Sequence, residues 1–230
     1  MKPHLHLAET RTPDHGTLAL YEHDGTYCVR LNGQALMDSS VTASELLLGE
    51  LAAARGTVGK AARVLIGGLG LGFTLRSVLH HEGAHSRVEV AELIPAVVTW
   101  NRTLLTGLNG TLLDDPRVKV LVADVGDVIA RAAPNQYDAL VLDIDNGPTA
   151  MVQKRNARLY GQAGIERMAV ALKPGARAAI WSATPDRAFA DRLAKTGFKV
   201  GVVPAKPHPT AKRCAHTIYT ADKPHSPMGQ

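Results

Sequence analysis

The sequence predicts an α/β fold in which a Rossmann-like sheet of seven strands follows a small N-terminal β-meander. From residue 63 onward, apolar runs alternate with helical patterns, as they do in parallel sheets with right-handed crossovers. The first run, 63–66, ends in a cluster of glycines, which is typical of the turn that leads from a buried strand into a helix. Ahead of it, Asp24-Gly25 and Asn32-Gly33 separate segments that alternate in the strand manner.

The composition is that of a globular protein. The 230 residues are 45% apolar, which suffices for one α/β domain and a small appendage. The polar start, and the lack of any run of about 18 apolar residues, lead us to expect a cytoplasmic protein without a membrane span. Cys28 and Cys214 lack metal-ligand spacing, so we expect no disulfide and no metal. The net charge of +5 is concentrated only near 204–214, without interleaved aromatic residues, which does not favour nucleic acid as a partner.

The N-terminal domain is expected to occupy residues 1–56. Its first 15 residues are polar and have no periodicity, so we expect a loose arm. Three antiparallel strands and a helix follow, at 17–22, 26–31, 34–37 and 41–55. Residues 56–60 are expected to link this part to the second domain. The exposed edge of the meander suggests a homodimer.

The second domain is expected at 57–221, with a disordered tail at 222–230. We predict its strands at 63–68, 87–93, 118–124, 137–144, 176–183, 199–204 and 215–221. We predict its helices at 72–82, 95–106, 125–132, 159–172 and 185–196, four of them with a left-handed glycine cap at Gly83, Gly107, Gly175 or Gly197. The short loop between the last two strands requires an antiparallel pair. Seven strands that end in such a pair are the architecture of the S-adenosylmethionine-dependent methyltransferases.

The glycine turn is the first candidate binding element. Gly67, Gly68, Gly70 and Gly72 leave the backbone open, so that amides at the helix start face a ligand. The tight Gly-x-Gly-x-Gly spacing is more usual where a nucleoside with a short polar tail is held than where a pyrophosphate is held. The alternative is a merely structural loop.

Two acidic residues at strand ends complete a predicted nucleoside site. Glu92 follows the glycine turn by roughly 20 residues, where a carboxylate can accept both ribose hydroxyls. The alternative for Glu92 is a surface acid. Asp124 closes the next strand and is predicted to accept the exocyclic amine of adenine, or to cap the following helix, or both. Val125, the next residue, belongs to the same predicted cofactor-binding set.

Asp143 and Asp145 are the candidate catalytic residues. They end a buried strand in the stretch Asp-Ile-Asp-Asn-Gly-Pro, and carboxylates beside an apolar sheet are costly without a partner. A bound sulfonium or an acceptor amine would supply that partner, and the alternative is a loop cap. We predict that Asp143 orients the amine nucleophile or takes its proton, and that it also contacts the cofactor.

Several segments together resemble one known family. They are Val-Leu-Ile-Gly-Gly before Thr74-Leu75-Arg76, Ala-Glu-Leu-Ile-Pro around Glu92, Asp-Pro-Arg-Val at 115–118, Tyr-Asp at 137–138, Leu-Tyr at 159–160 and Leu-Lys-Pro-Gly at 172–175. In order and spacing they resemble the spermidine synthase family of polyamine aminopropyltransferases over about residues 17–220. The resemblance implies that Glu92 binds ribose, Asp124 the adenine and the loop at 67–72 the methionine-derived tail. It also implies that Asp143 lies beside the acceptor amine.

Three departures from the family pattern change the expected substrates. Spermidine synthases have Gly-Gly-Gly-Asp-Gly in the loop, whereas this chain has Leu69, Gly70 and Leu71 and no carboxylate there. The family's Tyr-His pair is missing from 44–50, and its Asp-Ser-Ser-Asp-Pro is replaced at 143–148. Bare amides would accept the carboxylate of ordinary S-adenosylmethionine. We therefore expect that donor, and an acceptor other than putrescine.

Three functions follow as hypotheses. The first is an S-adenosylmethionine-dependent methyltransferase that acts on an amine-bearing small molecule. The second is aminopropyl transfer from decarboxylated S-adenosylmethionine, with Asp145 replacing the missing loop carboxylate. The third is a non-catalytic nucleoside-binding protein that has kept the fold.

Overall fold

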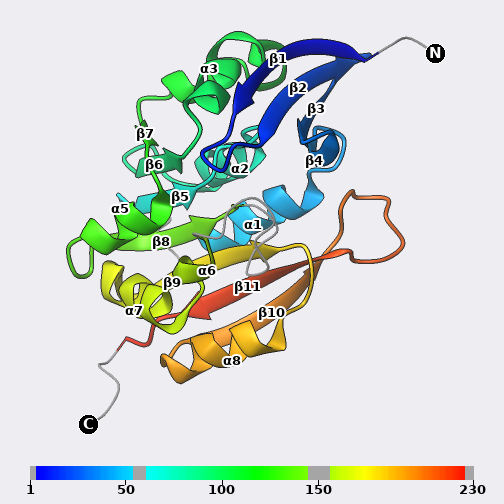
Figure 1. The fold of residues 1–230 in the computed structure, drawn as a ribbon. Helices are drawn as coiled ribbons and strands as arrows, with labels where there is room; N and C mark the ends of the chain where they lie inside the picture. Colours follow the sequence, from blue (N-terminus) through cyan, green and yellow to red (C-terminus); the bar gives the residue numbers. More distant parts are fainter. Residues whose placement is uncertain (1–3, 54–60, 145–155, 226–230) are drawn as a thin grey trace.

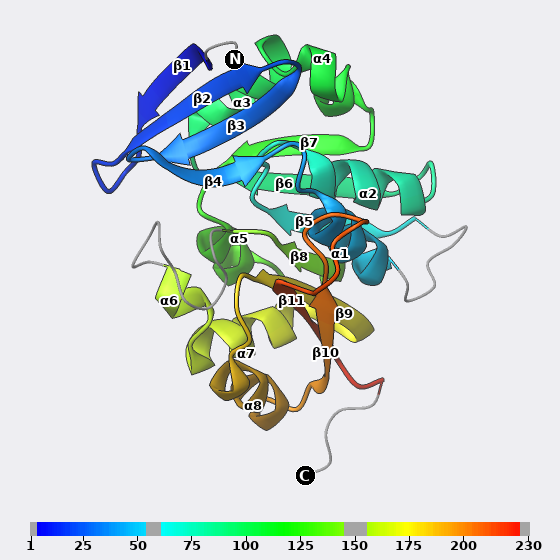
Figure 2. The same cartoon turned by 90° about the vertical axis from the view of Figure 1, so that its right-hand side faces the viewer.

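Two β-sheets organise the chain (Figure 1). The computed structural model describes residues 4–53, 61–144 and 156–225. The smaller sheet lies at one end of the larger one, beside α3, and α8 lies at the opposite end (Figure 1 and Figure 2). No helix within the described ranges is both long and apolar enough to cross a membrane.

The N-terminal sheet has four antiparallel strands in chain order: β1 (Leu5–Arg11), β2 (Thr17–His23), β3 (Thr26–Leu31) and β4 (Gln34–Asp38). The expectation of a loose arm was wrong, because residues 5–11 pair with β2 and make the meander four-stranded. This strand lies at the sheet edge and its side chains are all exposed or half-buried. An edge strand without a buried face does not need the apolar alternation by which strands are recognised in a sequence.

The large sheet has the order β10-β11-β9-β8-β5-β6-β7. Its strands are β5 (Arg63–Gly67), β6 (Arg87–Glu92), β7 (Val118–Val122), β8 (Tyr137–Leu142), β9 (Leu172–Ser182), β10 (Lys199–Ala205) and β11 (His216–Asp222). Neighbouring strands from β9 to β7 are parallel, whereas β11 is antiparallel to both β9 and β10. The predicted seven-stranded sheet with an antiparallel pair at its end is confirmed.

The helices are α1 (Ala43–Ala53), α2 (Phe73–His81), α3 (Pro95–Thr103), α4 (Thr106–Asn109), a 3-10 turn (Leu112–Asp114), α5 (Val125–Arg131), α6 (Asn156–Leu159), α7 (Gln162–Ala171) and α8 (Arg187–Lys195). One predicted helix is divided in two, because the helix expected at 95–106 breaks between α3 and α4. The helix expected at 159–172 corresponds to α7 and begins later, at Gln162, after the short helix α6.

The glycine caps were predicted with mixed success. Gly197 has the expected left-handed backbone, with φ of 91°, whereas Gly83 does not and Gly107 lies inside α4. Gly175 also has a left-handed backbone, with φ of 80°, but it lies within β9, which begins at Leu172 rather than at 176. Leu172 pairs with Tyr137 of β8, and the Gly175 amide donates to the Lys223 carbonyl at 2.9 Å. The same pairing places residues 222–225 beside β9, so only 226–230 of the expected disordered tail, like the expected linker 56–60, lie outside the described residues.

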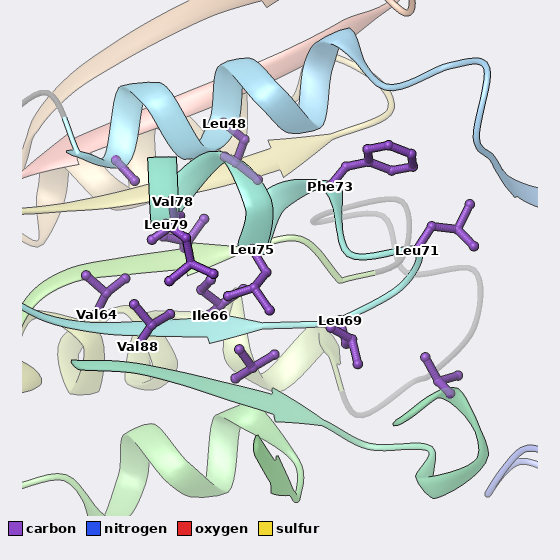
Figure 3. Close-up of a cluster of buried hydrophobic side chains, with 14 of the residues drawn as sticks. Leu48, Val64, Ile66, Leu69, Leu71, Phe73, Leu75, Val78, Leu79 and Val88 are labelled. Carbon is purple, nitrogen blue, oxygen red and sulfur yellow. The ribbon is translucent and has the colours of Figure 1, made fainter. Parts of the chain in front are cut away.

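Side chains of the central strands alternate between two apolar layers. Val64 and Ile66 of β5 pack toward α1 and α2, whereas Leu65 between them packs toward α5 and α7. Figure 3 shows Leu48 of α1 and Val78 of α2 in the first layer, with Val64 and Ile66 beneath them. Both faces of the sheet are therefore covered, as continuous apolar strands require.

Close contact between α1 and α2 depends on Gly49. A Cβ at this position would lie 2.5 Å from the Cβ of Ser77 and 2.9 Å from the backbone nitrogen of Val78. The Ser77 hydroxyl also donates to the Leu46 carbonyl at 2.6 Å. This contact sets the position of α1, which provides side chains to the site described below.

We expect Gly49→Ala to lower the free energy of unfolding by about 1–3 kcal/mol, because the added methyl group meets the backbone of α2. The matched control is Gly107→Ala, also helical, where the nearest atom to an added Cβ is the Tyr27 hydroxyl oxygen at 3.6 Å. Chemical denaturation of both variants tests this. An equal effect of the two substitutions would contradict it.

Candidate functional site

The glycine turn lies where the strand order of the large sheet reverses. Gly67, at the end of β5, is paired with Ala91 of β6 on one side and with Leu142 of β8 on the other. Beyond it, the Gly68 amide donates to the Ala91 carbonyl and the Asp143 amide donates to the Gly67 carbonyl, both at 2.9 Å. Ligands of open α/β sheets bind at this kind of position, outside the carboxyl ends of the strands.

Two glycines of the turn are required by their surroundings. Gly68 has φ of 90°, and a Cβ there would lie 2.2 Å from the Asp143 carbonyl oxygen. Gly70 has φ of 49°, and its Cβ would lie 2.9 Å from the sulfur of Met37 in β4. No residue with a side chain fits Gly68 without moving the strand end beside it.

The other residues of the turn carry no charged side chain. Leu69 and Leu71 are buried in the apolar layer around α2 (Figure 3). Gly72 is the N-cap of α2, and Gly67 packs against Val125, whose Cγ2 would lie 2.8 Å from an added Cβ. The turn therefore presents backbone and apolar groups, and no charged side chain, to the cavities beside it.

Glu92 closes β6 and is bound to the glycine turn. Only 7% of this residue is exposed, so the alternative of a surface acid was wrong. Its carboxylate accepts from the amides of Leu69 (2.9 Å) and Ile94 (2.8 Å). Burial raises the pKa of Glu92, while these backbone donors lower it in part. Each carboxylate oxygen has more than one acceptor site, so the group can accept further hydrogen bonds from a ligand.

Asp124 is the N-cap of α5, which is one of the two roles predicted for it from the sequence. Its side chain accepts from the Gly126 amide at 2.7 Å. Asp124 and Val125 also line the cavity described next, so the cap does not conflict with the predicted contact to adenine. That contact stays a prediction.

A first cavity of about 90 Å³ lies in front of the turn. It is lined by six of the predicted cofactor-binding residues: Gly68, Gly70, Glu92, Asp124, Val125 and Asp143. Apolar side chains complete it, among them Leu18, Leu36, Met37, Ile94 and Val97. Gly67 lies behind it, and Gly72 lines a second cavity. A mostly apolar space with acidic groups at its border suits a nucleoside.

Asp143 lies at the junction of the two cavities. Its Oδ2 accepts a hydrogen bond from the hydroxyl of Thr74 in α2. Burial raises the pKa of Asp143 to about 6, against a lowering by the Thr74 hydroxyl. Thr74 was not singled out as a site residue in the sequence analysis, although it follows the glycine turn directly. Asp145, the second candidate catalytic residue, lies outside the described residues.

The second cavity, of about 270 Å³, lies on the α1 side of the turn. It shares Leu36, Met37, Gly70 and Asp143 with the first. The polar residues that line it are Asp38, Glu45, Asp143, Trp181 and His216. Three of these are carboxylic acids, and neither Lys nor Arg lines the described wall, so the cavity favours cationic ligands.

Glu45 of α1 is a site residue that the sequence analysis missed. Its Oε2 accepts from the Ser44 hydroxyl (2.6 Å), and that hydroxyl lies 3.0 Å from Nδ1 of His216. Burial, and secondly the charge of Asp143, raise the pKa of Glu45 to about 7, while Ser44 lowers it. Burial lowers the pKa of His216. The sequence offered no signal beyond an acid in the first turn of a helix, which by itself is typical of helix capping.

Within the described ranges, no group of three His, Cys, Asp or Glu side chains is placed to hold a metal ion. The described site is a mostly apolar cavity joined to an acidic cavity at one shared carboxylate, that of Asp143.

The raised pKa of Glu45 has a consequence for stability. A carboxyl group whose pKa is higher in the folded than in the unfolded chain stabilises the fold below its unfolded pKa, and this contribution is lost as pH rises through the folded pKa. For Glu45 this loss of stability occurs between about pH 4.5 and about pH 7. We expect Glu45→Gln to be more stable than the wild type by about 1–2 kcal/mol at pH 8, with the difference shrinking toward pH 5.

Denaturation curves at pH 5, 6, 7 and 8 measure this difference. Glu50→Gln is the matched control, since Glu50 lies on the same helix and is exposed. A Glu45→Gln effect that is constant with pH would contradict the assignment.

Comparison with known proteins shows which family the chain resembles in sequence. The family model described as "Spermine/spermidine synthase domain" matches residues 50–183. Polyamine aminopropyltransferase 1 of Streptomyces coelicolor is 37% identical over 129 residues, which are 55% of this chain and 23% of that protein. Putrescine N-methyltransferase 1 of Nicotiana tabacum is 29% identical over 122 residues, or 52% of this chain and 30% of that protein.

The fold comparison extends over almost the whole chain. The crystal structure of spermidine synthase from Thermotoga maritima superposes with a TM-score of 0.75 at 19% identity, covering 97% of this chain and 75% of that one. In sequence, the match spans under a third of the length of each of the two curated relatives named above. The chain belongs to the spermine/spermidine synthase domain family.

Proposed function

We propose that this protein transfers a group from an S-adenosylmethionine-type sulfonium donor to the nitrogen of a small amine, most simply as a methyltransferase. One observation supports this above all. An apolar cavity with Glu92 and Asp124 meets an acidic cavity at Asp143 and Gly70. A donor and an acceptor that enter from the two cavities would meet at that junction.

The first cavity is proposed to hold the nucleoside of the donor. The Glu92 carboxylate, already positioned by two backbone amides, would accept the ribose hydroxyls. Asp124 would accept the adenine amine while it caps α5, and Val125 and Ile94 would pack against the base. The amides of the glycine turn would then face the methionine-derived tail.

The proposed reaction is a displacement at carbon. The amine lone pair forms an N–C bond while the C–S bond breaks, so the sulfonium leaves as a neutral thioether and the positive charge moves to the nitrogen. Such a step depends on in-line orientation more than on acid–base strength. Asp143 lies at the junction and would aim the amine at the reacting carbon.

The glycine turn supports ordinary S-adenosylmethionine as the donor. Leu69 and Leu71 are buried and uncharged, so the turn would not repel the donor's carboxylate. The alternative is aminopropyl transfer from the decarboxylated donor. It is supported by the 37% identity to a relative named polyamine aminopropyltransferase, and by Glu45 and Asp143, whose carboxylates line the second cavity. A homodimer and a cytoplasmic location stay predictions.

Titration calorimetry with S-adenosylmethionine, its decarboxylated form and the two thioether products tests the donor. Turnover of both donors with a panel of mono- and diamines tests the reaction. Turnover with S-adenosylmethionine supports methyl transfer, and turnover only with the decarboxylated donor supports the alternative. Donor binding without turnover on any amine would overturn the proposed enzyme.

We expect Glu92→Ala to weaken donor binding by roughly 10- to 100-fold, because hydrogen bonds to a buried carboxylate are among the strong ones. The reference is Glu50→Ala, an exposed acid outside both cavities, which should bind the donor like the wild type. Calorimetry measures both variants, with a thermal melt to check folding. Unchanged affinity in a folded Glu92→Ala protein would remove Glu92 from the site.

A further inference from the structure

A chain of hydrogen-bonded side chains lies beside the second cavity, and the reaction proposed above gives it no role. The chain runs from His216 on β11 through the Ser44 hydroxyl to the Glu45 carboxylate. It joins β11, the last strand in the sequence, to the first turn of α1 (Figure 2). Ser44 is fully buried, so this contact is internal to the protein.

The direction of these hydrogen bonds follows from the groups. While Glu45 is ionised, the Ser44 hydroxyl donates its only proton to it, so His216 donates to Ser44 from Nδ1. In the neutral ring this leaves Nε2 as an acceptor. Ser44 is thereby fixed as a donor toward Glu45, and it holds one carboxylate oxygen in a defined place.

Glu45 and Asp143 have different relations to the reacting centre. Asp143 lines both cavities and is bound to Thr74, whereas Glu45 lines the second cavity alone. The titratable groups that share this cavity with Glu45 are Asp38, Asp143 and His216. Burial, and secondly the charge of Asp143, raise the pKa of Glu45 and favour its protonated form near neutral pH, and a bound cation would displace that proton.

Trp181 provides a second indication of a ligand. Its ring lies 4.8 Å from that of His216 and lines the same cavity. Its Nε1 is buried without a hydrogen-bond partner in the described part of the chain. An ammonium group has no acceptor for this donor, so a cation would interact with the face of the ring rather than with Nε1. An indole face beside carboxylates also suits an ammonium group.

We propose that Glu45 is the group that receives the acceptor's ammonium and takes its proton, and that His216 and Ser44 act as positioning residues for Glu45. This inference rests on the proposed function. The step is a transfer of one proton from the ammonium nitrogen to the Glu45 carboxylate, which leaves a neutral amine with a free lone pair.

The binding experiment uses the full chain saturated with S-adenosylhomocysteine and titrates 1,4-diaminobutane and n-butylamine. Calorimetry at pH 7 in two buffers of different ionisation enthalpy counts the protons released. We expect about half a proton per bound amine in the wild type, because Glu45 is near its midpoint at this pH. We expect Glu45→Gln to release much less and to bind roughly tenfold more weakly.

The kinetic experiment separates a role in proton transfer from a merely structural one. In the wild type, kcat/KM should rise with pH through the titration of Glu45. Ser44→Ala removes a donor that favours the carboxylate, so the rise should move to higher pH, and in Glu45→Gln this limb should disappear. Glu50→Gln is the control and should keep the wild-type profile.

The outcomes distinguish the two proposals. Turnover with wild-type proton release and an unchanged pH profile in Glu45→Gln would overturn this inference and leave the proposed function intact. Donor binding without amine binding or turnover would overturn both. Loss of proton release in Glu45→Gln but not in Glu50→Gln, with turnover in the wild type and donor affinity unchanged, would support both the proposed function and this inference.

Discussion

The site depends on the close approach of two strand ends. The Asp143 carbonyl is so near Gly68 that no side chain fits between them, and the amide of Asp143 is bound to Gly67. This contact brings the end of β8 against the turn after β5 and places one carboxylate where two cavities meet. Glu92 fixes the same turn from the other side through Leu69. The turn is therefore held by its two neighbouring strands rather than by its own sequence alone.

The acids of the site are held at an energetic cost. Glu45, Glu92 and Asp143 are all shifted toward the neutral form by burial, and each is compensated only in part by hydrogen bonds from Ser44, backbone amides or Thr74. Structural stability alone would favour apolar residues in these places. Retaining three such groups around adjoining cavities is the pattern expected of a functional site.

Most of the fold was predictable because local patterns coincide with it. Continuous apolar runs such as 63–66 marked the buried strands, and the glycine turn and Glu92 followed from the rule that ligands bind at strand ends. Strand β1 was missed because an edge strand has no buried face to give it a pattern. Glu45 was missed because its importance comes from the charge of Asp143 and, through the Ser44 hydroxyl, from His216, which is 171 positions later in the chain. Such tertiary contacts leave no local trace.

Leu36 and Met37 of the small N-terminal sheet line both cavities, and the sulfur of Met37 rests against Gly70. A single short strand thus forms part of the boundary of both cavities at once. Substitutions at these two positions of β4 would change the shape of both compartments while leaving the residues Glu92, Asp124 and Asp143 in place. The small sheet is in this sense the part of the fold through which both compartments can be reshaped together.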